Sequence, residues 1–462
     1  MVLNLFNHIQ GENGSQWAKF IREMGSDHLL FVAVDAAKYT HKAQFSNYYG
    51  DILGNPFAFD ASLTGFEKLK KNVQKAKTQY GLKVVVIGIE TTGHYYEDLT
   101  LHSRSEGYFV RIINSSITNE ERKALLNSSK TDNLDLSAIL VAMIHGRGTF
   151  NELPTGDPHR LQRLTRARRE LVQQRTALQN QIHAYVDRIF REFEGKTTWK
   201  DGKREKVRPL SDTFGKASVY IMRHCLHPSD ILSLGQEGLR ELSIKENLKL
   251  RDSSIQILVD YAQTSISQPK ECVEIDQYLL NQHLDLHECY NNQIKQLERK
   301  IEDLFVHTDG AIILSVCGIG VVTGAELFAE MGDISKFKHA GQLIKMAGTN
   351  PIVKQSGDRK PSHYQISRQG RKPFRNIVYQ IGKSLAVNNL EMHKRYVELI
   401  ERGKYSGQAY IALGNRMIRL AFSMIKHRTL YRTNKENYVL IDEITKKLHK
   451  PNAKMFFERF VL

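Results

Sequence analysis

The run KVVVIGIE, at residues 83–90, constrains the fold of this chain more than any other segment. Its apolar residues follow one another without the polar alternation of a strand that has one solvated face. A run of this length predicts a strand covered on both faces, as in an α/β sheet. The apolar run HLLFVAV, at residues 28–34, predicts a second buried strand. Each run ends on a carboxylate, Asp35 in one case and Glu90 in the other.

The segments around these two runs predict a mixed sheet with helices. Strand patterns at 42–50 and 55–62 follow the first run, and a strand pattern at 108–114 follows the second. The helices expected in this part of the chain lie at 65–81, 95–105, 119–126 and 133–146. Three strands followed by alternating helices and strands are typical of an α/β domain, which we expect to span residues 1–156.

Two long helical segments, at 159–190 and 290–305, follow in the middle of the chain. Both carry residues at heptad spacing, which are Leu164, Leu171, Leu178, Tyr185, Ile294, Leu297, Ile301 and Leu304. This spacing predicts pairing, either as an antiparallel coiled-coil arm or as a dimer seam. The stretch 195–270 between them is polar and carries few signals. Its segment KTTWKDGKREKVRPL predicts a flexible basic loop.

Changes in pattern divide the remainder of the chain into three regions. Residues 157–308 are expected to form a helical, coiled-coil region with a polar insert. Residues 309–430 open with a glycine-containing segment and are expected to form a mostly α-helical domain. Residues 431–462 are expected to form a basic tail.

The charge balance indicates a nucleic acid partner. The formal net charge of the 462 residues is +16 and the isoelectric point is about 9.4. A surplus of this size is typical of proteins that bind phosphates. The four cysteines, Cys225, Cys272, Cys289 and Cys317, have no spacing that predicts a zinc site or a disulfide framework. We find neither a secretory signal nor an apolar run that could cross a bilayer, and expect a cytoplasmic protein that acts on the nucleoid.

Four acidic residues form the first candidate site. The carboxyl ends of strands in an open α/β sheet border one crevice, so Asp35 and Glu90 are expected to face each other there. Asp132 and Asp135 lie three residues apart at a helix start and share a face, although acids also occur there as ordinary caps. Converging carboxylates repel one another unless a cation neutralises them, and oxygen ligands favour Mg²⁺ or Mn²⁺.

This acidic pattern predicts phosphoryl transfer. Two bound metal ions can activate the attacking oxygen and stabilise the leaving oxygen of a phosphodiester. Two acids after strands and two at a helix start are the order found in ribonuclease-H-like nuclease domains. We therefore expect the domain at 1–156 to carry a nuclease-type catalytic site.

Glycines and bases in the C-terminal half form two further candidate sites. Gly318 and Gly320 predict a turn between helical segments, where backbone N–H groups can approach a phosphate as in a helix-hairpin-helix clamp. Downstream, QSGDRKPSHYQISRQGRKPFR places serines among bases. The bases are Arg359, Lys360, Arg368, Arg371, Lys372 and Arg375. Such a cluster neutralises phosphates, and a hydroxyl within it could attack phosphorus.

Together these motifs resemble the DEDD transposases of the bacterial insertion-sequence-110 family, which are RNA-guided recombinases. The matching segments are VAVDAAK, IETTGHY, KTDNLDLSAI, GIGVVTGAEL and QSGDRKPSHYQISRQG. The resemblance covers roughly residues 28–195 and 290–391. The common order of five motifs makes it specific.

The resemblance implies an N-terminal domain like the resolvase RuvC, a coiled-coil segment and a transposase domain with a catalytic serine. It assigns the nucleophile to Ser356, leaves Ser367 as a second candidate, and places Lys130 beside the acidic helix. It also implies donor and target DNA as substrates, a structured non-coding bridge RNA as the guide, and a homodimer or homotetramer. Acids and serine would then come from different subunits.

This chain departs from the family pattern at three places. Thr349 and Asn350 stand where a leucine-containing turn is usual. The middle region at 196–290 is larger than expected, and the chain continues after residue 430. These differences concern the geometry of the arm and its partner contacts more than the chemistry.

Three other functions fit parts of the sequence. A RuvC-like, metal-dependent, structure-specific endonuclease would use the acids without a covalent intermediate. A sugar-kinase-like ATPase would need paired glycine-rich loops on two similar halves, and no second half occurs. An RNA chaperone would bind nucleic acid without needing the four acids.

Overall fold

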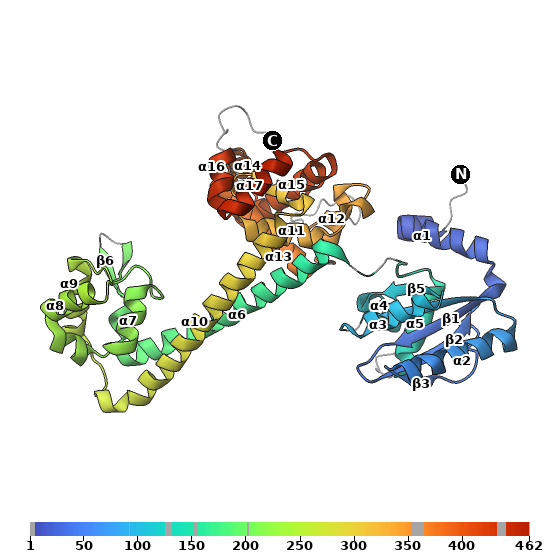
Figure 1. Ribbon diagram of the computed structural model, residues 1–462, viewed down its shortest axis with the longest axis horizontal. Helices are drawn as coiled ribbons and strands as arrows, with labels where there is room; N and C mark the ends of the chain where they lie inside the picture. Colours follow the sequence, from blue (N-terminus) through green and yellow to red (C-terminus); the bar gives the residue numbers. More distant parts are fainter. Residues whose placement is uncertain are drawn as a thin grey trace. The chain divides into compact units, whose positions relative to one another are not determined.

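A computed structural model describes residues 5–91, 93–124, 132–150, 153, 155–200, 203–352, 365–431 and 440–461. The chain divides into two compact units, Met1–Leu153 and Pro154–Leu462. Figure 1 shows a sheet with helices in the first unit and helices almost throughout the second. Among the described residues no helix is both long and apolar enough to cross a membrane.

The first unit is built on a five-stranded mixed sheet in the order β3-β2-β1-β4-β5. The strands are β1 (Leu29–Asp35), β2 (Thr40–Asn47), β3 (Phe57–Asp60), β4 (Val84–Glu90) and β5 (Phe109–Ile113). Strands β1, β4 and β5 are parallel, whereas β2 and β3 pair antiparallel. The predicted α/β domain with a mixed sheet is therefore confirmed.

Helices cover both faces of this sheet. They are α1 (Leu5–Met24), α2 (Leu63–Tyr80), α3 (Tyr95–Ser105), α4 (Ser115–Ala124) and α5 (Asp132–Ile144). In β1, Leu30 and Val32 belong to the apolar cluster that contains residues of α2 and α3. Their neighbours Leu29 and Phe31 belong to the cluster that contains residues of α1 and α5. Because side chains alternate along a strand, the central strands need apolar residues at every position.

Arg111 of β5 ties the end of α5 to the sheet. Its side chain is 1% exposed and donates hydrogen bonds to the carbonyl oxygens of Gly146, Arg147 and Gly148. The guanidinium also lies 4.3 Å from the ring centre of Trp17. Burial lowers the pKa of Arg111 to about 9. These contacts satisfy carbonyl groups just beyond a helix end and hold α5 in place.

The second unit contains an arm of two helices, α6 (Gly156–Phe190) and α10 (Glu274–Phe305). They pack side by side (Figure 1), and their side-chain contacts run in opposite directions along the sequence. Three contacts show this, Arg168 with Glu298, Arg175 with Asn291, and Gln179 with His287. The pairing is therefore antiparallel.

The two ends of the arm belong to separate hydrophobic cores. Leu161 and Ile301 pack into the core of a C-terminal lobe, whereas Ile182 and Leu284 pack into the core of a second lobe. Between these ends the contacts include the polar pairs named above. The residues at heptad spacing are buried or half-buried throughout.

The region at 195–270 forms that second lobe rather than a polar insert with a flexible loop. It contains β6 (Lys196–Lys200), β7 (Lys203–Val207), α7 (Lys216–His224), α8 (Pro228–Lys245) and α9 (Asp252–Thr264). Apolar residues of α7, α8 and α9 share one core with the ends of α6 and α10. The sequence of this region is mostly polar and does not predict a core, because each helix contributes only a few apolar residues to it. The expected basic loop contains an antiparallel pair of strands, β6 and β7.

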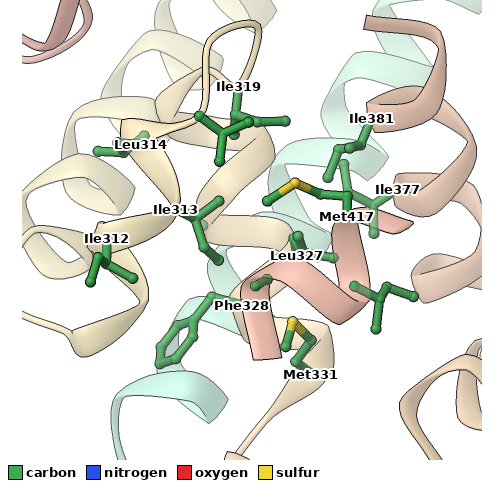
Figure 2. Close-up of a cluster of buried hydrophobic side chains, with 14 of the residues drawn as sticks. Ile312, Ile313, Leu314, Ile319, Leu327, Phe328, Met331, Ile377, Ile381 and Met417 are labelled. Atoms are coloured by element: carbon green, nitrogen blue, oxygen red, sulfur yellow. The ribbon is translucent and has the colours of Figure 1, made fainter. Parts of the chain in front are cut away.

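The C-terminal lobe is helical. Its elements are η4 (Asp309–Ser315), α11 (Val321–Met331), α12 (Ala340–Ala347), α13 (Lys372–Asn388), α14 (Leu390–Glu401), α15 (Ser406–His427), α16 (Leu440–Lys447) and α17 (Lys450–Phe460). Figure 2 shows Ile313, Leu327 and Met417 in its core. Ile444 and Phe456, from the region expected as a tail, are buried in the same core.

Two glycines allow α13 and α15 to pack closely. A side chain at Gly382 would overlap the backbone carbonyl of Tyr410, and one at Gly414 would overlap the backbone carbonyl of Val378. Each helix therefore contributes a glycine where the backbone of the other passes. Gly407, in the first turn of α15, has open space around it.

We predict that Gly382→Ala lowers the thermal unfolding midpoint of the C-terminal lobe. The added methyl group would force two packed backbones apart, at a cost of about 1–3 kcal/mol. The matched control is Gly407→Ala, which should leave the midpoint unchanged or raise it, since alanine favours helix. Calorimetry of both variants measures the effect. Equal midpoints for the two variants would contradict the close packing.

Candidate active site

The first two acidic residues lie side by side at the carboxyl edge of the sheet. Strands β1 and β4 are parallel neighbours, and Val34 is the register partner of Ile89. Asp35 and Glu90 are the next residues of the two strands. Asp35 is half-buried, and Glu90 is 8% exposed. The structure therefore places both at one edge, as the apolar runs predict.

Asp135 reaches the same corner from α5. Its carboxylate is buried and lies 3.0 Å from the Nε atom of Arg122, which belongs to α4. The charges of Asp35 and Asp135 both act on Glu90. Three of the four predicted acids are thus brought together. Asp132 begins α5, one turn before Asp135, and its side chain lies outside the described residues.

The pKa of Glu90 is shifted by the burial and the charges of this corner. Burial raises the pKa of the Glu90 carboxyl above its ordinary value, and the charges of Asp35 and Asp135 raise it further. A hydrogen bond from Thr118 and the charge of Arg122 act in the opposite direction. The net shift is upward, so the ionised form is disfavoured.

Thr118 and Arg122 are site residues that sequence reasoning missed. Both belong to α4, which follows β5 and brings a hydroxyl and a guanidinium to the acids. A signal was present, because TNEERK places bases on a helix that directly follows a strand of the sheet. Arg122 supplies part of the countercharge that the carboxylates need.

The donor set fits a hard divalent cation. Carboxylate oxygens are the preferred ligands of Mg²⁺ and Mn²⁺, and excess negative charge in a half-buried corner favours binding of a cation. Among the described side chains, no three acids, histidines or cysteines stand in ligand geometry. This holds for Asp35, Glu90 and Asp135 as well, and the side chain of Asp132 is not among those described.

The predicted glycine turn connects η4 to α11. Gly318 has a φ of 89°, which favours glycine, and its carbonyl oxygen accepts a hydrogen bond from Ser384. Gly320 caps α11, and its N–H donates to the hydroxyl of Thr323. The segment before the turn is a 3₁₀ helix. Ser384 lies near the C-terminal end of α13.

Some of the predicted basic residues belong to the described part of the chain, and others do not. Lys130, Arg359 and Lys360 lie outside the described residues, as does Ser356. The other four, Arg368, Arg371, Lys372 and Arg375, gather at the N-terminal end of α13. Lys372 stands about 18 Å and Arg375 about 14 Å along α13 from Ser384, which contacts the glycine turn, at 1.5 Å per residue. The structure therefore separates the glycine turn from these bases.

A short bridge joins described residues on the two sides of 353–364. Pro351 pairs with Ile366, and the hydroxyl of Ser367 donates to the side-chain oxygen of Asn350 at 2.7 Å. Thr349 is buried and donates to Asn415 of α15 at 2.6 Å. Thr349 and Asn350 are the two residues that depart from the family pattern. Thr349 connects the bridge to α15, and Asn350 connects its two sides through the hydroxyl of Ser367.

Ion pairs hold the arm against the same lobe. Arg166 of α6 binds the buried Glu330 of α11 at 2.8 Å through two hydrogen bonds, and Arg169 pairs with Glu326. Arg169 also donates to the carbonyl oxygen of Pro373, in the first turn of α13. The arm therefore contacts the helix that begins with the basic residues.

Family models match both halves of this geometry. The model described as DEDD transposase of IS110 matches residues 32–191, which include Asp35, Glu90 and Asp135. The model of the transposase IS116/IS110/IS902 family matches residues 310–397. The chain belongs to the IS110 family of transposases. The two matched segments together cover more than half of it.

Individual relatives are similar over a shorter part. A 44.8 kDa protein of insertion element IS116 from Streptomyces clavuligerus is 30% identical over 142 residues, 30% of this chain and 35% of the relative. A 42 kDa protein of insertion element IS900 from Mycobacterium paratuberculosis is 28% identical over 143 residues, 30% of this chain and 36% of the relative. The pilin gene-inverting protein of Moraxella bovis is 24% identical over 143 residues, 30% of this chain and 44% of the relative. The matches thus span between a third and a half of these relatives.

We predict that Glu90→Gln raises the thermal unfolding midpoint of the N-terminal unit near pH 7 without divalent cations. The amide keeps the shape of the side chain but avoids a buried charge beside Asp35 and Asp135. Because the folded pKa of Glu90 is raised, the wild-type carboxyl costs stability above that pKa. The difference should shrink as the pH falls and the carboxyl is protonated.

Melting curves between about pH 4 and pH 8 measure this difference. The matched control is Glu67→Gln on the exposed face of α2, which should not change the midpoint. A Glu90→Gln variant that melts below wild type at neutral pH would contradict the crowding of the acidic corner.

Proposed function

We propose that this chain is a DNA recombinase of an insertion element, which cuts and rejoins strands through a phosphoserine intermediate. The observation that carries the proposal is the convergence of Asp35, Glu90 and Asp135 at the carboxyl edge of the sheet. The mixed sheet with its acids is compatible with a ribonuclease-H-like, RuvC-like domain. The family matches add support for DNA as the substrate.

The acids are proposed to hold Mg²⁺ or Mn²⁺. The ligands would be Asp35, Glu90, Asp132 and Asp135, with Arg122 sharing the countercharge. Bound there, the cation would stabilise charge on the oxygens of a phosphodiester. The crowding at Glu90 indicates that the corner gains stability when a cation enters. Removal of divalent cations should therefore abolish cleavage.

Ser356 is proposed as the nucleophile. Its Oγ atom would form a bond to phosphorus while the bond between phosphorus and the leaving strand oxygen breaks. The serine proton passes to a nearby base, and the leaving oxygen ends as a hydroxyl. The phosphoserine bond conserves the energy of the phosphodiester, so rejoining requires no ATP. Ser367, whose hydroxyl is engaged with Asn350, is the weaker candidate.

Basic residues would bind the DNA backbone around this serine. Arg368, Arg371, Lys372 and Arg375 gather at one end of α13 and would neutralise phosphates. Lys130, Arg359 and Lys360 are proposed to do the same. The turn at Gly318 and Gly320 would bind a second stretch of backbone through N–H groups at the start of α11.

The partners proposed are donor and target DNA, a structured non-coding bridge RNA, and further copies of the chain in a dimer or tetramer. The net charge of +16 supports binding to nucleic acid. A relative whose name describes pilin gene inversion supports strand exchange over simple cutting. Base pairing with RNA would select the target, while the protein contacts backbone and shape.

A RuvC-like endonuclease is the second candidate. The observation that favours it is that the acidic corner alone has the residues of a metal-dependent nuclease. Such an enzyme would hydrolyse DNA and form no covalent link. The two functions therefore differ in whether a covalent protein–DNA adduct forms.

Covalent trapping distinguishes them. The full chain is incubated with Mg²⁺, the RNA of its native element and end-labelled DNA carrying the element ends, then denatured. We predict a protein–DNA adduct that disappears in Ser356→Ala and Asp35→Ala. It should persist in Ser367→Ala and in the exposed control Asp98→Ala.

Cleavage that persists in Ser356→Ala without any adduct would establish the endonuclease. An adduct that persists in Ser356→Ala but is lost in Ser367→Ala would identify Ser367 as the nucleophile. Activity that survives Asp35→Ala and the removal of divalent cations would contradict the acidic site.

A further inference from the structure

The hairpin of β6 and β7 projects one tryptophan from the lobe at the far end of the arm. Trp199 of β6 is 72% exposed, whereas Trp17, the other tryptophan of the chain, is fully buried. Exposing so large an apolar ring costs free energy, about 25 cal/mol for each Å² of apolar surface. Singly exposed apolar side chains are common on protein surfaces, so the case for a binding site depends on the residues that surround this ring.

The base of the hairpin contacts α9. Lys196 donates to Thr264 at 2.9 Å, and its Nζ atom lies 5.0 Å from the ring centre of Tyr261. The hydroxyl of Tyr261 donates to the carbonyl oxygen of Val207 at 3.1 Å. These contacts hold both strands at one end and orient one face of the hairpin toward α9.

The alternation of side chains then places Trp199 on the opposite face. Lys196 points to α9, so Thr197 and Trp199 point away from it. Lys206 is the register partner of Thr197 and shares this outer face. Thr197, Trp199 and Lys206 are all exposed. Diagonal neighbours such as Trp199 and Lys206 lie about 7–8 Å apart.

The hairpin as a whole carries more basic than acidic residues, and Lys206 of its outer face borders a hollow. Between residues 196 and 208 the sequence has six basic and two acidic residues. Lys206 and Arg208 also line a hollow of about 300 Å³, whose other lining residues are His183, Glu194, Ser211, Asp212, Thr213 and Phe214, so two acidic side chains share it with the cations. An aromatic ring beside cations is the combination that binds single-stranded nucleic acid, because the ring stacks on a base and the cations bind phosphates.

We propose that the outer face of this hairpin binds unpaired RNA, with a base stacked on Trp199 and the adjoining phosphates at Lys206 and Arg208. A protein partner fits less well, because a tryptophan at a protein interface is surrounded by other apolar residues that exclude water. Here the described residues of the face are threonine and lysine. Duplex DNA fits less well because its bases must first be unstacked.

Stacking and phosphate contacts would serve RNA and single-stranded DNA alike, and we commit to RNA because the proposed function includes an RNA partner. The inference rests on the proposed function in one respect, which is that the RNA partner proposed there would bind at this face. It requires neither the acidic corner nor Ser356. The site lies in the region 196–290, which is larger here than the family resemblance leads one to expect.

Fluorescence of the full chain tests the proposal directly. Iodide quenches exposed tryptophan, so it should quench Trp199 and leave the buried Trp17 emitting. A short oligouridylate should protect Trp199 from iodide as it binds. The same titration followed by anisotropy of labelled RNA gives the affinity.

We predict that Trp199→Ala weakens oligouridylate binding about five- to hundredfold, the effect of removing one stacked base. Lys206→Ala should weaken binding less and reduce its dependence on salt. The matched control is Tyr278→Ala, which removes another exposed aromatic side chain, 61% exposed, from α10. It should leave binding unchanged.

Three outcomes would overturn the proposal. Trp199→Ala could bind as well as wild type, or polyglutamate could protect Trp199 equally, which would indicate an acidic protein partner. Oligodeoxyuridylate could bind more tightly than the RNA, which would assign the face to single-stranded DNA. Loss of RNA binding in Trp199→Ala would support the RNA site even if the covalent trapping experiment gave no DNA adduct. Failure of the RNA site and failure of the proposed recombinase function can therefore be told apart.

Discussion

The repulsion between carboxylates at one edge of the sheet is the constraint on which the N-terminal unit depends. Asp35, Glu90 and Asp135 approach one another in a corner where Glu90 is nearly buried. Each negative charge in such a place is costly unless a cation or hydrogen bond compensates for it. Arg122 and Thr118 of α4 supply partial compensation. The negative charge that remains is the reason for proposing a cation at this corner.

The rest of the unit positions this corner. Strands β1 and β4 deliver their acids together because both are parallel, both are covered on two faces, and their register is shared. Helix α5 packs against the sheet, and Arg111 holds its end through three carbonyl groups. A buried arginine is an unusual structural element, and here it fixes the helix that carries Asp135. The acidic site thus depends on packing some distance from the acids.

The sequence predicts the parts of this fold that local pattern determines. The buried strands, their terminal acids and the long helices follow from runs and periods of apolar residues. The sequence shows a helix with bases after β5, but it does not show that Arg122 and Thr118 reach Glu90, because that depends on the packing of α4 against α5. The lobe at 195–270 was missed for a similar reason. Its core is assembled from a few apolar residues on each of several helices, so no single segment reveals it.

The arm shows how polar and apolar contacts divide their roles. Its ends belong to two hydrophobic cores, and Arg166 with Glu330 fastens one end through a charged, two-point hydrogen bond. Glu330 is buried, whereas the Arg166 side chain is 41% exposed, and a two-point pair of this kind adds geometric specificity as well as energy. The arm therefore sets the direction in which the outer lobe, with its exposed Trp199, extends from the C-terminal lobe.

The central claim is that the acidic corner binds a divalent cation, and anomalous scattering from crystals of the full chain soaked with Mn²⁺ tests it most directly. The account predicts a peak bound by the carboxylates of Asp35, Glu90 and Asp135, and none at that place in an Asp35→Ala crystal. Absence of a peak from the wild-type corner, with Arg122 still 3.0 Å from Asp135, would contradict it.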